Sequence, residues 1–263
     1  MKKTLLILAL LIIVIFAGNL YPQDEEFINA MVKAKKNLNT ALNTYDEKDL
    51  LKVRGEFERT LQLKKNVWVV YYFMGLVDYH LATSFMSEKK KDNEKVKKYT
   101  ESGLANTDKS LETRDDFADT YVLRMALQYN RWSYEPDKMG NIINASTLAD
   151  ETAKRLEPLN PRYHLMKGVS LLYTPEAFGG GVNPSLEYLN KAYDIFQTRK
   201  EAEVYYPDWG YDMTCGFIAT AYMKRDKEGD LEKAKTYLDK GLEINPQNGF
   251  LMSVKKQYEE KKK

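Results

Sequence analysis

Few residues of this chain have side chains of the kind that act in catalysis or hold metals. Its 263 residues include two histidines, His80 and His164, and one cysteine, Cys215. No H-E-x-x-H, C-x-x-C, G-x-S-x-G or phosphate-loop motif occurs. A single cysteine also excludes an intramolecular disulfide. We therefore expect no catalytic residue, no metal site and no cofactor, and a protein that is not an enzyme.

These three residues have structural interpretations. Cys215 shares a helical stripe with Ile218 and Ala219, so we expect a buried thiol. His80 lies near the end of an expected helix, and His164 occupies a position where a packing side chain is expected. The sequence predicts a structural role for both histidines.

The triple glycine Gly179–Gly181 is the most unusual local feature. Exposed backbone N–H groups of such a run can hold an anion. The run lacks the lysine and serine that accompany a nucleotide-binding loop. We interpret it as a turn whose backbone needs positive φ angles.

Aromatic residues in two connecting segments are the best candidates for a binding surface. The segment 204–211 reads VYYPDWGY, and aromatic rings on a loop offer stacking area with polar tips. The segment 173–183 adds two further rings. The candidate binding residues are Tyr173, Phe178, Tyr205, Tyr206, Trp209 and Tyr211. Alternatively these rings wedge between helix pairs four and five, since packing is the usual role of tyrosine in a chain with 19 of them.

The elements that position these residues are expected to be helices. In the stretch 215–246, apolar or small residues recur at i, i+3, i+4 and i+7, first in 215–222 and again in 234–241. The pattern K-x-K-x-Y-x3-G-L occurs at both 95–104 and 233–242, which indicates an internal repeat. No strand-like alternation is found. The chain predicts ten helices in five pairs, followed by one more helix.

This stretch resembles the tetratricopeptide repeat, whose spacing is W-x2-L-G-x2-Y followed by A-x3-F-x2-A-x4-P. Cys215 stands at the tryptophan position and Gly241 at that of the last alanine. The resemblance implies an all-α fold: a right-handed superhelical solenoid of about five such helix pairs with a C-terminal capping helix, over residues 24–263. It also implies a non-enzymatic scaffold for a protein or peptide, which lies on the concave face lined by the first helix of each pair.

A second interpretation is a small-molecule role. The chain resembles, more loosely, the periplasmic helical-repeat subunit found with tripartite secondary transporters. That family is typically lipid-anchored, and no cysteine follows the N-terminal apolar run of this chain. A ligand-sized pocket between the segments 173–183 and 204–211 favours this second interpretation. A long open groove favours binding of a peptide.

The N-terminal segment predicts where the protein works, and the charge balance argues against one class of partner. Lys2 and Lys3 precede the apolar run Leu5–Phe16, which indicates a signal peptide over residues 1–23 or an uncleaved inner-membrane anchor. We expect a periplasmic or secreted body that contacts the membrane only if this segment is retained. Without the two lysines the chain has 38 basic and 38 acidic side chains. Such a balance argues against nucleic acid as a partner.

Overall fold

The computed structural model describes residues 22–88 and 90–263, which form eleven α-helices, four short 3-10 helices and no strand. The α-helices are α2 (Pro22–Ala41), α3 (Glu47–Thr60), α4 (Val67–Ser84), α5 (Asn93–Thr113), α6 (Ala118–Asn130), α7 (Met139–Leu156), α8 (Pro161–Tyr173), α9 (Val182–Thr198), α10 (Tyr211–Arg225), α11 (Asp230–Ile244) and α12 (Gly249–Lys261). The 3-10 helices are η1 (Leu61–Leu63), η2 (Arg131–Ser133), η3 (Pro136–Lys138) and η4 (Glu176–Phe178).

Residues 1–21 of the predicted signal peptide lie outside the described residues. Its last two residues, Pro22 and Gln23, begin α2. Within the described chain, no helix is both long and apolar enough to span a bilayer.

Polar side chains fix the starts of several helices. Asn160 caps α8: its Oδ1 atom accepts a hydrogen bond of 3.0 Å from the backbone N–H of Tyr163. Asp46 caps α3 in the same way. Helix α9 begins at Val182, so Pro184 lies in its first turn, where the missing N–H would have no intrahelical partner.

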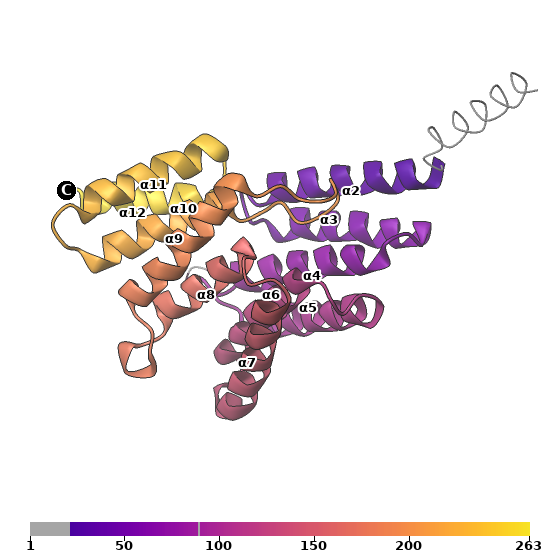
Figure 1. Ribbon diagram of the computed structural model, residues 1–263, viewed down its shortest axis with the longest axis horizontal. Coiled ribbons are helices and arrows are strands. Elements are labelled where there is room, and N and C mark those ends of the chain that lie inside the picture. The colour runs from indigo at the N-terminus through magenta and orange to yellow at the C-terminus, as the bar shows by residue number, and fades with distance from the viewer. Residues whose placement is uncertain (1–21, 89) are drawn as a thin grey trace, which may run out of the picture.

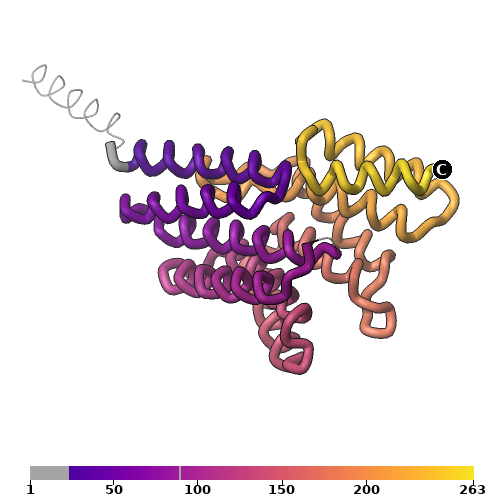
Figure 2. The backbone as a smooth tube through the Cα atoms, turned by 180° about the vertical axis from the view of Figure 1, so that it is seen from behind, coloured from indigo at the N-terminus to yellow at the C-terminus, as the bar shows by residue number. Residues whose placement is uncertain are grey.

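The helices pack as five consecutive antiparallel pairs, α2–α3, α4–α5, α6–α7, α8–α9 and α10–α11. Successive pairs stack on one another, and α12 covers α10 and α11 at the end (Figures 1 and 2). A solenoid needs such a terminal cover because its last pair would otherwise expose its apolar face. The predicted all-α solenoid with a capping helix is confirmed.

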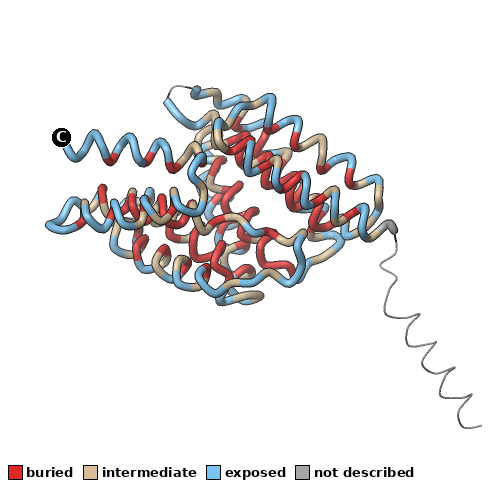
Figure 3. The backbone as a smooth tube through the Cα atoms, turned by 90° about the horizontal axis from the view of Figure 1, so that it is seen from above, coloured by how far each residue is buried: buried red, intermediate tan, exposed pale blue. Residues whose placement is uncertain are grey.

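The buried apolar side chains form three clusters that follow the order of the pairs. The first belongs mainly to α2–α5, the second to α6–α10 and the third to α10–α12. Figure 3 shows the buried positions on the faces where helices meet and the exposed positions on the outside. Tyr79 and Trp209 pack against both the first and the second cluster. The core is therefore continuous from one pair to the next.

Small residues let α10 and α11 approach closely. Ala219 and Ala234 are fully buried, and a Cβ atom on Gly241 would lie 3.1 Å from the Cβ atom of Cys215. Cys215 is buried among these residues, and burial raises the pKa of its thiol to about 12. The prediction of a buried thiol is confirmed.

The triple glycine forms the turn between α8 and α9. Gly179 and Gly181 have φ angles of 80° and 108°, a region that favours glycine. A Cβ atom on Gly180 would lie 2.1 Å from the carbonyl oxygen of Thr174, and the N–H of Gly181 donates to the carbonyl of Leu171 at 2.9 Å. The prediction of a turn with positive φ angles is confirmed.

The two ends of the solenoid touch, which the sequence did not predict. The backbone N–H of Gly249 donates to the carbonyl of Leu42 at 3.3 Å. The side chain of Asn43 donates to Gln247 Oε1, also at 3.3 Å. The turn after α2 therefore meets the start of α12 (Figure 2). The first and last pairs enclose a space between them.

The close contact of α10 and α11 makes a stability prediction. Ala234→Leu adds three carbon atoms at a fully buried position and should lower the free energy of unfolding by about 1–3 kcal/mol. Thr236→Leu, at an exposed position of the same helix, is the matched control and should have little effect. Chemical denaturation followed by circular dichroism measures both. Equal stabilities of the two variants would contradict the observed register of these helices.

Candidate functional site

The connector between α9 and α10, residues 199–210, lies across the first helices of several pairs. The Tyr205 ring meets the Phe27 ring of α2 edge-on, with centroids 5.2 Å apart. The indole Nε1–H of Trp209 donates to the hydroxyl of Tyr72 on α4 at 2.8 Å. Figure 1 shows this connector as an orange loop beside α2. The connector thus occupies part of the concave face that the repeat resemblance assigns to a partner.

Lys35 of α2 holds the middle of the connector. Its ammonium donates to the carbonyls of Val204 and Tyr206 at 2.7 and 2.6 Å and pairs with Asp208 at 3.1 Å. Burial lowers the pKa of Lys35, although the carboxylate of Asp208 opposes this. An ammonium has three N–H donors, so these three acceptors satisfy it fully.

Arg162 of α8 holds both ends of the connector. Its guanidinium is fully buried and pairs with Asp119 of α6 and, at 2.8 Å, with Glu201. It also donates to the carbonyl of Trp209 at 3.5 Å. Burial disfavours the charged form, but the two carboxylates outweigh it and raise the pKa of Arg162. Removing either partner would leave a buried charge uncompensated.

The structure separates the six candidate binding residues into two places. Tyr205, Tyr206 and Trp209 pack against the first core cluster. Tyr173 ends α8 and Phe178 ends η4, and these two residues are 65% and 82% exposed. Tyr211, the first residue of α10, stacks on the Phe196 ring of α9 and lies in the same region as Trp209. The rings therefore do not form one continuous surface.

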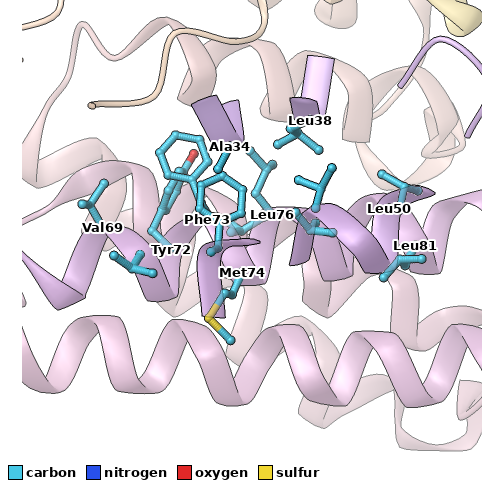
Figure 4. Packing of buried hydrophobic residues seen from close by; sticks show 14 of the residues in the cluster. Ala34, Leu38, Leu50, Val69, Tyr72, Phe73, Met74, Leu76 and Leu81 are labelled. Atoms are coloured by element: carbon cyan, nitrogen blue, oxygen red, sulfur yellow. The ribbon is translucent and has the colours of Figure 1, made fainter. Parts of the chain in front are cut away.

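Behind the connector lies a partly open cavity of about 310 Å³. Its apolar part comes from α2 and α4, including Leu38, Phe73 and Leu76, which lie side by side in Figure 4. Trp209 and Tyr211 line it from the connector and from α10. The segment 173–183, where the sequence placed the other half of a pocket, does not line it. The last helices supply that wall instead.

His80 of α4 lines this cavity. The residue is only 3% exposed, and its ring is edge-on to those of Tyr45 and Tyr79, with centroids 5.9 and 5.4 Å away. Burial lowers the pKa of His80 to about 4, so the imidazole is neutral near pH 7. The sequence predicted a structural role for His80 and did not indicate that it lines a cavity.

Asp212 lies on the opposite wall, at the start of α10. Its Oδ2 atom accepts hydrogen bonds from the side chains of Asn245 and Asn248 at 3.0 and 2.8 Å. Its Oδ1 atom accepts the backbone N–H of Met213 at 2.8 Å. No lysine or arginine of the described chain forms a salt bridge with it. The residues on this wall lie far apart in the sequence and carry no motif that could have identified them.

The described residues hold no group of three or more histidine, cysteine, aspartate or glutamate side chains placed to bind a metal ion. Apolar side chains line the cavity together with the polar side chains of Lys35, Asn39, His80, Asp208, Asp212, Asn245 and Asn248.

Comparison with known proteins places the fold. No family model matches the chain, and no curated protein sequence matches it. The solved structure of the HusA haemophore from Porphyromonas gingivalis is similar with a TM-score of 0.62, at 17% identity over 81% of this chain and 98% of that chain. A thermophilic TPR protein of Thermus thermophilus is similar with a TM-score of 0.55, at 14% identity over 87% and 98%. At these identities the likeness shows a TPR-like helical fold.

The buried His80 makes a prediction about pH. An unfolded chain binds a proton at His80 near pH 6.5, and the folded chain binds it only near pH 4. Stability should therefore fall as the pH drops from 6.5 to 4, by up to about 3 kcal/mol from this residue. His80→Phe removes that term. Urea denaturation at several pH values should show a shallower loss for the variant, and parallel curves would contradict the assignment.

Proposed function

We propose that this protein is a non-enzymatic TPR-like binding protein that holds a small organic molecule in the cavity behind its connector. The observation that carries this proposal is the cavity itself, which is lined by residues from the first two helix pairs, the connector and the last helices. Its volume of about 310 Å³ lies at the lower end of the range of small-molecule sites. The sequence had left the choice between a closed pocket and an open groove unresolved.

The connector covers part of the concave face, which also favours a small-molecule ligand over a peptide. A peptide partner needs the first helices of the pairs to be accessible, and the connector covers Phe27, Trp68 and Tyr72 on two of them. One similar structure is that of a haemophore, so this fold can serve a small-molecule ligand.

We also propose that the protein works in the cell envelope, either in the periplasm or after secretion. The support is the sequence of residues 1–23, where two lysines precede the apolar run Leu5–Phe16. Retention of this segment would tie the protein to the inner membrane. Comparing the N-terminus of the protein from membrane and soluble fractions by mass spectrometry distinguishes the two cases. An intact N-terminus on cytoplasmic protein would contradict export.

The cavity makes a binding prediction that uses two positions on α2. Asn39 lines the cavity and is exposed at its rim, so Asn39→Trp should fill the entrance without disturbing the core. Lys36→Trp, exposed on the same helix and outside the cavity, is the matched control. We expect the first variant to weaken binding about tenfold, or about 1.4 kcal/mol, and the control to leave it nearly unchanged.

The measurement begins with native mass spectrometry of protein isolated from its own cells, which detects a retained ligand. Isothermal titration with neutral aromatic fragments such as indole follows, on the wild type and both variants. Absence of a retained molecule, together with no binding of any probe at millimolar concentration, would contradict the proposal. Equal weakening by both tryptophans would place the ligand outside the cavity.

A second candidate function is peptide binding on the concave face, and one observation favours it. The connector lies on this face as an irregular segment, and Lys35 binds two of its backbone carbonyls. Backbone contacts of this kind do not depend on the side chains of the bound segment. A partner peptide that displaces the connector would find the same lysine available.

Weakening the connector tests this second function. Tyr205→Ser with Tyr206→Ser removes two rings that pack on the first cluster, and should increase the affinity for a synthetic peptide with the sequence of residues 202–210. A peptide of the same composition in scrambled order is the control. Fluorescence anisotropy measures both. No binding to the variant, with its helical content preserved, would argue against a peptide-binding groove.

A further inference from the structure

The polar side chains around the cavity differ in whether their hydrogen bonds and charges already have partners. Lys35 is the cation that lines it, and two carbonyls and Asp208 use all three of its N–H donors. An anionic ligand would have to break one of these bonds to reach a positive charge. Breaking a bond would also release the connector that Lys35 holds. The cavity is therefore poorly suited to a carboxylate or a phosphate.

Asp212, which also lines the cavity, differs from Lys35 in its partners. Its two carboxylate oxygens accept three N–H bonds, but no lysine or arginine of the described chain forms a salt bridge with it. A carboxylate can accept about four hydrogen bonds, so Asp212 has room for one more donor and its charge lacks a cationic partner.

The apolar interior determines what the rest of the ligand must be. Leu38, Phe73 and Leu76 form one side, and Trp209 with Tyr211 forms another. A charged group without an apolar body would leave these side chains against empty space or loosely held water. The faces of the two aromatic rings also attract positive charge. The walls therefore match a molecule that is apolar along its length and cationic at one end.

We propose that the cavity selects a cationic amphiphile: an organic ammonium ion whose head pairs with Asp212 and whose aromatic or aliphatic body lies against the apolar side chains of α2 and α4. This inference rests on the proposed small-molecule function and specifies its ligand class. Asp212 supplies the negative charge, because Lys35 already pairs with Asp208 and forms no salt bridge with Asp212.

Three compounds with the same ring test the charge preference: phenethylamine, phenethyl alcohol and 3-phenylpropionate. At pH 7 their charges are positive, zero and negative, and their apolar parts are nearly identical. Isothermal titration of the wild-type protein should show phenethylamine binding about tenfold more tightly than the alcohol, and the propionate binding most weakly. Because the wild type alone decides this comparison, the result does not depend on how well a variant folds.

Two variants locate the charge. Asp212→Asn should remove most of the preference for the amine over the alcohol while leaving the binding of the alcohol nearly unchanged. Asp239→Asn makes the same charge change at an exposed position outside the cavity and is the matched control. Circular dichroism confirms that each variant is folded. A preference that survives Asp212→Asn in a folded protein would overturn the role of this carboxylate.

The remaining outcomes separate this inference from the proposed function. Binding of the alcohol or the propionate as tightly as the amine, weakened by Asn39→Trp, would overturn the charge preference and leave the cavity as a ligand site. No binding of any of the three compounds at millimolar concentration would count against both.

Discussion

The buried guanidinium of Arg162 determines how this solenoid is arranged. A charged group can lie inside a protein only if carboxylates and carbonyls compensate for the lost water. Arg162 takes one carboxylate from the neighbouring pair, at Asp119, and another from the connector, at Glu201. The connector must therefore dock for Arg162 to be satisfied. One buried charge thus ties the pairs α6–α7 and α8–α9 to the loop between α9 and α10.

Docking of the connector changes what the repeat offers to a partner. In an open solenoid the first helices of the pairs form a continuous groove. Here the rings of Tyr205 and Tyr206 cover the aromatic residues of α2 and α4, and Lys35 binds the connector backbone. Contact between the turn after α2 and the start of α12 closes the other side. What remains is a cavity, which suits a small molecule better than an extended peptide.

The side chains that line the cavity both hold the connector in place and favour one charge of ligand. The lysine that lines it already pairs with Asp208, whereas Asp212 has no salt-bridge partner within the described chain. A site built in this way discriminates by charge, because a ligand of the wrong sign must break existing bonds before it forms new ones. The hydrogen bonds and the ion pair of Lys35 also hold the connector in place. The entrance of the cavity and its preference for one ligand charge therefore depend on the same bonds.

The sequence by itself determined the helices, their pairing and the small residues between α10 and α11. Those features depend on neighbours three or four positions apart, or on the next helix along the chain, so the period of the apolar residues reveals them. The aromatic connector was also recognisable, but its position was not. Lys35 and the connector carbonyl that it binds at Tyr206 are 171 residues apart, and Asp212 meets Asn248 across 36. Only the superhelical path of the chain brings such residues together, and no local pattern records that path. The cavity, with His80 on one wall and Asp212 on the other, was therefore decided by the tertiary structure.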